Sequence, residues 1–211
     1  MIKVLIADDH AIVRRGLRQI LDDSGCMTVV AEAEDGAGAV QQVRALGSGV
    51  DVALLDISMP GKSGIDALKM IRDEAPRLPV LILSMYPEEQ YAVRLIKAGA
   101  AGYMTKESAP QELVDAIRKV ASGKKYISPS VAEMLAEEVG GGNAGALHSG
   151  LSDREYQVLL KLASGKTVSD VAEEMALSVK TISTYRSRIL AKMRLKNNAE
   201  LTHYVITHQL V

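Results

Sequence analysis

Three acidic residues follow two apolar segments of strand length in the first part of the chain. Residues 2–7 are followed at once by Asp8 and Asp9, and the apolar run 50–55 ends on Asp56 before a Met-Pro-Gly turn. Such runs are typical of buried parallel strands, and ligands bind where the carboxyl ends of these strands meet. Neighbouring strands would bring three carboxylates together, which requires raised pKa values or a bound cation. Mg2+, a hard ion that prefers oxygen ligands, fits such a pocket.

Two further polar residues stand at the ends of later apolar segments. Ser84 closes residues 79–84, and Lys106 follows residues 101–105. A carboxylate that accepts a phosphoryl group needs a cation, a donor for the phosphoryl oxygens and a fixed ammonium. The three acids with Mg2+, the Ser84 hydroxyl and the Lys106 ammonium supply all of these.

The elements that must position these residues alternate between strand and helix. Strands are expected at residues 2–7, 27–33, 50–56, 79–84 and 101–105, and amphipathic helices begin near Ala11, Gly36, Ser63, Pro87 and Ser108. This order predicts an α/β fold with a doubly wound, five-stranded parallel sheet. Ser63 and Ser108, the latter with Pro110 in the next turn, are candidate helix caps.

The second part of the chain has only helical periodicity. A short helix is expected at residues 128–139, and a glycine-rich linker at residues 140–150. Helices are then expected at residues 153–164, 168–175, 179–195 and 197–209, the first with Ser152 and Glu155 as a capping box. We therefore predict three parts: an α/β domain at 1–123, a linker with a short helix at 124–150, and a small all-α four-helix domain at 151–211.

Charge is distributed unevenly between these parts. Residues 148–211 carry nine basic and six acidic residues, although the whole chain has a formal net charge of -1. From Met175 to Ala199 there are six basic residues and no acid, which favours a helix that faces phosphates. The single cysteine, Cys26, excludes an internal disulfide, and the N-terminus shows no signal peptide or membrane span. A cytoplasmic protein is expected.

The basic segment has the pattern of a helix-turn-helix. Residues 168–175 would form its first helix, 176–178 its turn and 179–195 its second helix. On the second helix Ile182, Ile189 and Met193 share one arc and should face the core. The opposite arc is small or hydrogen-bonding, so a nucleic acid backbone could approach it; it consists of Lys180, Ser183, Thr184, Ser187 and Ala191.

The first 123 residues resemble the flavodoxin-like receiver domain of two-component response regulators. The resemblance rests on Asp8-Asp9, on Asp56 before Met59-Pro60-Gly61, on Ser84, and on residues 102–106 around Lys106. It implies that Asp56 takes a phosphoryl group from a phosphohistidine on a sensor histidine kinase, and that the protein catalyses only its own phosphorylation and dephosphorylation. It also implies that Asp9, Asp56 and the Ser58 carbonyl hold Mg2+ directly and Asp8 holds it through water. Tyr103 would turn inward when Ser84 moves onto the phosphoryl group.

Residues 151–185 resemble the LuxR-type helix-turn-helix, which together with a receiver identifies the NarL/FixJ class of response regulators. The resemblance implies double-stranded DNA as a partner, dimerisation through the last helix and, as a candidate partner, RNA polymerase. By position, Ser183, Thr184 and Ser187 would face base edges. The residues that would mostly contact phosphates are Lys180, Thr181, Tyr185 and Arg188.

Two other interpretations stay open, an enzyme and a protein-binding module, whereas a P-loop does not fit. Gly61-Lys62-Ser63 resembles part of a P-loop, but the glycine required five residues earlier is Asp56. A phosphatase with an aspartate nucleophile would have an Asp two residues after the first, where this chain has His10. The helical module could also bind a protein partner instead of DNA. Turnover of a small phosphoester, or salt-dependent retention on DNA, would discriminate among these.

Overall fold

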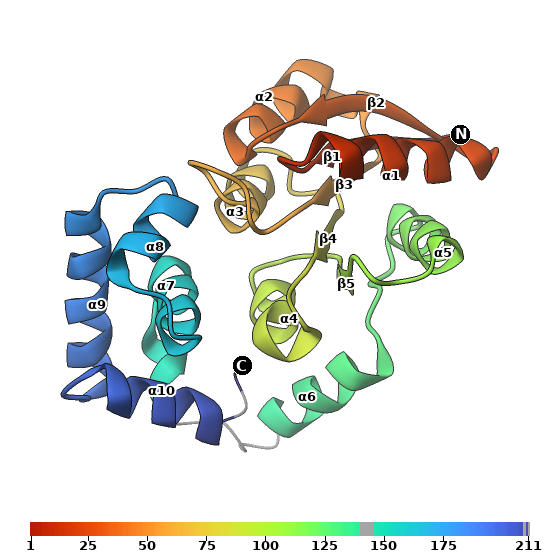
Figure 1. Cartoon of the computed structure of the whole chain (residues 1–211). Helices are drawn as coiled ribbons and strands as arrows, with labels where there is room; N and C mark the ends of the chain where they lie inside the picture. The colour runs from red at the N-terminus through yellow and green to blue at the C-terminus, as the bar shows by residue number, and fades with distance from the viewer. Residues whose placement is uncertain (140–145, 209, 211) are drawn as a thin grey trace. The chain divides into compact units, whose positions relative to one another are not determined.

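The computed structural model describes residues 1–139, 146–208 and 210. The chain divides into two compact units, Met1–Ala132 and Glu133–Val211. The first unit contains a five-stranded parallel sheet and the second unit is helical (Figure 1). The predicted fold class, a doubly wound α/β unit followed by a small helical unit, is confirmed.

The sheet has the strand order β2-β1-β3-β4-β5, and every pairing is parallel. Its strands are β1 (Ile2–Ala7), β2 (Met27–Ala33), β3 (Val52–Leu55), β4 (Val80–Ser84) and β5 (Gly102–Thr105). All residues of β3 and β4 are buried, because helices cover both faces of the sheet. The order reverses between β1 and β3, and the crevice at such a switch point is where ligands bind in open α/β sheets.

Helices connect the strands and bury one apolar stripe each against the sheet. They are α1 (Ala11–Asp23), α2 (Gly36–Leu46), α3 (Gly64–Glu74), α4 (Glu88–Lys97) and α5 (Pro110–Ala121), with a short 3-10 turn, η1 (Gly47–Gly49). Leu17 and Leu21 of α1 share one core cluster with Leu113 and Ile117 of α5. In Figure 1, α5 lies on the opposite side of the strands from α3 and α4.

The predicted cap at Ser63 is confirmed and the one at Ser108 is wrong. Ser63 forms a capping box with Asp66, in which each side chain bonds the other residue's backbone. Before α5 the residue in the N-cap position is Ala109, which is extended (φ -62°, ψ 145°) and makes no side-chain cap bond. Pro110 explains the difference, because it occupies the first helical position and drives the residue before it out of the helical region.

Within the described residues 146–208 the helical unit contains four helices with well-formed N-terminal caps. They are α7 (Asp153–Ala163), α8 (Val168–Glu174), α9 (Val179–Met193) and α10 (Asn198–Thr207). The predicted capping box of Ser152 and Glu155 is present, and Thr167 forms a second one with Asp170. These local bonds satisfy the free N–H groups of the first turn and fix where each helix begins.

The turn between α8 and α9 is tight and sets the direction of α9. Ala176 has a positive φ of 51°, and Ser178 caps α9 by accepting a bond from the Thr181 N–H at 3.0 Å. At the other end Arg194 adopts the left-handed conformation, with φ 55°, so α9 stops two residues before the predicted end. Ile182, Ile189 and Met193 are fully buried, as their shared arc predicts.

The short helix predicted at residues 128–139 is observed as α6 (Pro129–Val139), which begins one residue later. Of the predicted glycine-rich linker, residues 140–145 lie outside the described residues. Leu147–Gly150 forms a 3-10 turn, η2, in which His148 Nδ1 lies 2.9 Å from the Tyr204 hydroxyl of α10. No helix in the described part of the chain is long and apolar enough to cross a bilayer.

Candidate functional site

Asp8 and Asp56 stand next to each other because β1 and β3 are neighbours. Ala7 pairs with Leu55, and the Asp56 N–H donates to the Ala7 carbonyl at 2.8 Å. Both carboxylates are nearly inaccessible, with Asp8 2% and Asp56 4% exposed. Asp9, which comes one residue later in the loop, keeps 31% of its side chain exposed.

Lys106 reaches this pair from β5, on the far side of β4. Its N–H donates to the Ser84 carbonyl at 2.8 Å, which continues the β4–β5 ladder beyond the strand ends. Its Nζ lies 2.5 Å from Asp8 Oδ2 and 3.3 Å from Asp56 Oδ2. The sequence prediction that these side chains meet at one edge of the sheet therefore agrees with the observed positions.

The electrostatics of the pocket are incompletely balanced. Burial raises the pKa of Asp56 above the usual range, the Lys106 ammonium opposes this rise and the Asp8 charge adds to it. One ammonium cannot neutralise three carboxylates, so a further cation would remove the residual repulsion. Carboxylate oxygens, one of them on the partly exposed Asp9, suit Mg2+, which keeps several waters when bound. The residues present therefore fit that ion.

The β3–α3 loop passes very close to Asp56. A Cβ on Gly64 would lie 1.9 Å from the Asp56 carbonyl oxygen, so no other residue fits at this position without moving the backbone. The Gly64 N–H donates to the Ile57 carbonyl at 3.1 Å. Gly64 thus anchors the start of α3 beneath the carboxylate and holds the loop that contains Ser58.

Ser84 and Tyr103 are both buried beside the pocket. The Ser84 Oγ accepts a bond from the Tyr86 N–H at 3.2 Å, and the Tyr103 hydroxyl donates to the Tyr86 carbonyl at 2.7 Å. Burial raises the pKa of the Tyr103 phenol strongly, although a hydrogen bond with Ser84 lowers it in part. Both residues therefore hold the same loop residue, Tyr86, whose hydroxyl in turn accepts a bond from Ser58 Oγ at 3.3 Å.

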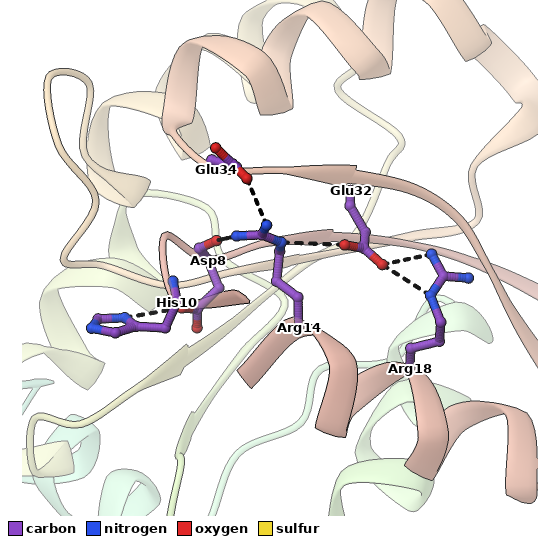
Figure 2. A network of polar contacts seen from close by, with 6 residues as sticks. All are labelled: Asp8, His10, Arg14, Arg18, Glu32 and Glu34. Atoms are coloured by element: carbon purple, nitrogen blue, oxygen red, sulfur yellow. Dashed lines mark hydrogen bonds and ion pairs between the residues drawn. The ribbon is translucent and has the colours of Figure 1, made fainter. Parts of the chain in front are cut away.

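Sequence reasoning missed the contacts that hold the Asp8–Asp9 loop from outside. His10 is an exposed loop residue, and its Nδ1 lies 2.7 Å from Asp9 Oδ1 and 3.3 Å from Asp8 Oδ1. These three side chains form the one group among the described residues that could hold a metal ion by the spacing of their ligand atoms. Figure 2 shows a second contact, from the Arg14 guanidinium to the Asp8 carbonyl at 2.8 Å. Nothing in the sequence around His10 or Arg14 predicted either contact.

The second unit presents one face of α9 to solvent. All residues of the predicted nucleic-acid arc are exposed, namely Lys180, Ser183, Thr184, Ser187 and Ala191. Arg188 is also exposed, whereas Thr181 and Tyr185 are half-buried. The Thr184 and Ser187 hydroxyls donate to the carbonyls one turn earlier, at 2.9 and 3.0 Å. Their lone pairs remain able to accept, and a rotation about χ1 would let them donate.

Two of the six basic residues counted near α9 bond within the unit. Arg186 Nε donates to Asn198 Oδ1 at 2.6 Å, and Lys192 Nζ donates to Glu155 Oε2 at 2.6 Å. The first bond joins α9 to α10 and the second joins α9 to α7. The sequence-based argument from six basic residues therefore counted two that the fold uses to hold α9 in place.

Comparison with known families matches both units. Residues 4–118 match the response regulator receiver domain, and residues 149–205 match the bacterial regulatory proteins of the luxR family. The chain is 39% identical to the response regulator UvrY of Escherichia coli strain K12 over 211 residues, covering all of this chain and 96% of that protein. It is 37% identical to the response regulator GacA of Pseudomonas aeruginosa strain PAO1 over 212 residues, covering all of this chain and 98% of that protein.

Solved structures of response regulators are also similar to this chain. RcsB from Salmonella enterica serovar Typhimurium, bound to a promoter in the presence of the phosphomimetic BeF3-, is similar with a TM-score of 0.66 and 29% identity. That match covers 98% of each chain. A LuxR-family two-component response regulator from Aurantimonas sp. SI85-9A1 is 37% identical, with a TM-score of 0.59, over 64% of this chain and 96% of the other.

Proposed function

Because the chain belongs to the response regulators with a receiver domain and a LuxR-type DNA-binding domain, we propose that phosphorylation of Asp56 controls sequence-specific binding of α9 to DNA. The observation that carries this proposal is the position of Asp56, buried beside Asp8 and 3.3 Å from the Lys106 ammonium. We assign residues 1–123 to the receiver, 124–150 to the linker and 151–211 to the DNA-binding domain.

The proposed chemistry is transfer of a phosphoryl group from a phosphohistidine on a sensor histidine kinase. An Asp56 Oδ attacks phosphorus, the P–N bond breaks and an aspartyl phosphate forms, while the histidine nitrogen takes up a proton. Lys106 and the Ser84 hydroxyl would stabilise the charge on the phosphoryl oxygens. Asp9, Asp56 and the Ser58 carbonyl would hold Mg2+, with Asp8 acting through water, and the ion would supply neutralising positive charge. Loss of the phosphoryl group by hydrolysis would reset the protein.

The proposed switch uses the two residues that hold Tyr86. When Ser84 moves toward a phosphoryl group on Asp56, it gives up its present bond with the Tyr86 N–H. Tyr103, bonded to the carbonyl of the same residue, would then change position with the loop. The surface formed by α4, β5 and α5 would report this change, and a two-state equilibrium would shift toward the active form.

In the active form α9 would lie in the major groove of double-stranded DNA. Ser183, Thr184 and Ser187 would read base edges, since they are exposed on one side of α9. Phosphate contacts would come from Lys180, Thr181, Tyr185 and Arg188. The luxR-family match favours this function over binding of a protein partner by the helical unit.

We further propose that the active protein is a homodimer paired through α10. On this helix Ile206 is 60% exposed. The residues that line a shallow groove are Leu195, Ala199, Glu200, His203, Tyr204, Thr207 and His208. A symmetric pair of α10 helices would cover the apolar surface and place two copies of α9 on paired half-sites. RNA polymerase is a candidate partner on DNA, and the cytoplasm is the proposed location.

Two experiments test this function. Selection of DNA from a random library, with and without beryllofluoride and Mg2+, should enrich a two-fold symmetric motif mainly with the phosphoryl mimic. Equal enrichment in both states would refute phosphorylation as the control of DNA binding. In a labelling experiment with a radioactive phosphodonor, Asp56→Asn should fold normally and take up no label; stoichiometric labelling of this variant would place the phosphoacceptor elsewhere.

A further inference from the structure

Arg14 is a buried cation that bonds the backbone carbonyl of Asp8. Only 8% of the residue is exposed, although it lies in the first turns of the surface helix α1. Its guanidinium makes three bonds, to the Asp8 carbonyl at 2.8 Å, to Glu34 Oε1 at 2.7 Å and to Glu32 Oε2 at 3.2 Å. Figure 2 shows this guanidinium between the main chain of Asp8 on one side and two glutamates on the other. Glu32 belongs to β2, and Glu34 follows that strand directly.

The contact with Asp8 is to the backbone, which decides what Arg14 can control. The Asp8 side chain already has its own partners, Lys106 Nζ and the His10 N–H. The backbone N–H of Asp8 donates to the Ala33 carbonyl at 3.2 Å. The backbone carbonyl of Asp8 shares a rigid plane with the N–H of Asp9. By holding that carbonyl, Arg14 fixes the orientation of the Asp8–Asp9 peptide and so the direction in which the Asp9 side chain leaves the backbone.

The charges of Arg14 and its neighbours cancel without any contribution from the acids of the pocket. Arg18 donates to Glu32 Oε1 through Nε at 2.9 Å and through a terminal nitrogen at 2.6 Å. Two arginines therefore face two glutamates, and the group adds no net charge beside the acids of the pocket. The influence of Arg14 on the pocket must then act through geometry. Its planar guanidinium presents donors in fixed directions, so its three bonds hold their acceptors in one arrangement.

We infer that Arg14 is a positioning residue that orients Asp9 for binding the divalent cation, by clamping the Asp8–Asp9 peptide to β2. The inference rests on the proposed function, since it assumes that Asp9 holds Mg2+. It assigns Arg14 no contact with the ion or with a phosphoryl group. The consequence is a selective effect on metal affinity and a small effect on the chemical step once the metal is bound.

The chain offers a matched control for this inference in Arg18. Both arginines bond Glu32 from α1, but only Arg14 contacts Asp8. The full-length protein, Arg14→Gln and Arg18→Gln would be titrated with Mg2+ alone by calorimetry and with Mn2+ by electron paramagnetic resonance. Arg14→Gln should weaken binding of both ions by about tenfold or more, the range seen when the partner of a metal ligand is removed. Arg18→Gln should stay within about twofold of wild type, since its pair is partly exposed.

Labelling from acetyl phosphate separates positioning from a merely structural role. In Arg14→Gln the Mg2+ concentration for half-maximal labelling should rise with the dissociation constant, while the maximal rate at saturating Mg2+ recovers. Arg14→Lys keeps the charge but not the fork, so its metal affinity should lie between those of Arg14→Gln and wild type. If Arg14→Gln does not fold, Glu34→Ala serves in its place: Glu34 has a 78% exposed side chain, and its truncation removes one of the three anchors of the guanidinium.

The possible outcomes separate the inference from the function on which it rests. Wild-type protein that binds no Mg2+ and takes no label would overturn the proposed function. Wild-type protein that binds Mg2+, together with equal affinities in the Arg14 and Arg18 variants, would overturn the role of Arg14 and leave the function standing. An unchanged Mg2+ requirement with a reduced maximal rate would also contradict the inference, because it would mean that Arg14 acts on the chemical step.

Discussion

Lys106 Nζ lies 2.5 Å from Asp8 Oδ2 at the carboxyl edge of the sheet, where the Asp8 side chain is buried and the Lys106 side chain keeps 10% of its surface exposed. Lys106→Gln would leave Asp8 and Asp56 facing each other with no ammonium between them. We expect the variant to lose about 3 kcal/mol of unfolding free energy at neutral pH without divalent ions, as when one member of a buried pair is removed. Urea unfolding would measure the loss.

The same experiment has two controls. Added Mg2+ should return part of the lost stability to Lys106→Gln, because the cation takes over charge neutralisation in the folded state. Lys124→Gln, at an exposed position, should unfold like wild type. Wild-type stability of Lys106→Gln in a chelating buffer would show that the two carboxyl groups do not repel each other as the geometry implies.

Tyr103→Phe removes the hydroxyl that donates to the Tyr86 carbonyl at 2.7 Å. The carbonyl of the half-buried Tyr86 loses a partner, so stability should fall by about 1 kcal/mol. Labelling of Asp56 should persist, whereas the gain in DNA affinity on adding beryllofluoride should shrink. Tyr126→Phe is the control, since the hydroxyl of Tyr126 bonds the exposed Glu112. A full response to beryllofluoride in Tyr103→Phe would argue against Tyr103 as part of the switch.

Lys180→Ala should weaken binding to all DNA sequences alike. One lost phosphate contact should reduce the slope of log affinity against log salt by about one. Arg186→Gln is the informative control: it also removes one positive charge from α9, but the Arg186 guanidinium bonds Asn198. We expect Arg186→Gln to lower stability and to leave the salt slope unchanged. Equal slopes for Lys180→Ala and wild type would remove Lys180 from the interface.

Thr184→Ala should change base preference, because Thr184 lies exposed on the arc of α9 that we assign to base edges. The variant should lose discrimination of about 1 to 3 kcal/mol at one position of each half-site. Selection from a random library would show this as a flattened position in the motif. An unchanged motif would mean that this face of α9 does not read bases.

Glu155 should make the stability of the helical unit depend on acid pH. Burial acts to raise the pKa of Glu155, but bonds from Lys192 and Ser152 outweigh it, so the folded pKa lies below the ordinary value. A group with a lowered folded pKa stabilises the fold above its unfolded pKa of about 4.3, and this contribution is lost as pH falls through the folded value. Glu155→Gln should therefore cost about 1 to 3 kcal/mol at neutral pH.

The difference between wild type and Glu155→Gln should shrink as the pH falls below about 4. Urea unfolding followed through amide resonances of α7 to α10 would resolve the helical unit from the receiver. Glu174→Gln is the control: Glu174 pairs with Lys161 and Lys166 at the surface, so its loss should cost less than about 1 kcal/mol. A pH-independent difference at Glu155 would contradict the assigned ionisation.

The sequence by itself determined the features that depend on local chemistry and periodicity. Three such features are the strand that ends just before Asp56, the Ser152 and Glu155 capping box, and the buried arc of Ile182 and Ile189. Each follows from residues a few positions apart. Even the error at Ser108 was local, because the backbone preference before Pro110 outweighed the capping preference of serine.

Only the tertiary structure decided the contacts between distant segments. The bonds of Arg14 with Asp8 and Glu34, and of Lys192 with Glu155, join elements that no periodic pattern relates. The sequence does not show whether a charged residue in a helix faces solvent or is buried against a neighbouring element. Strand order and helix packing decide whether such a residue is exposed or buried. For this reason the sequence placed the acids of the pocket correctly, but it could not separate the basic residues of α9 that face solvent from those that hold the fold together.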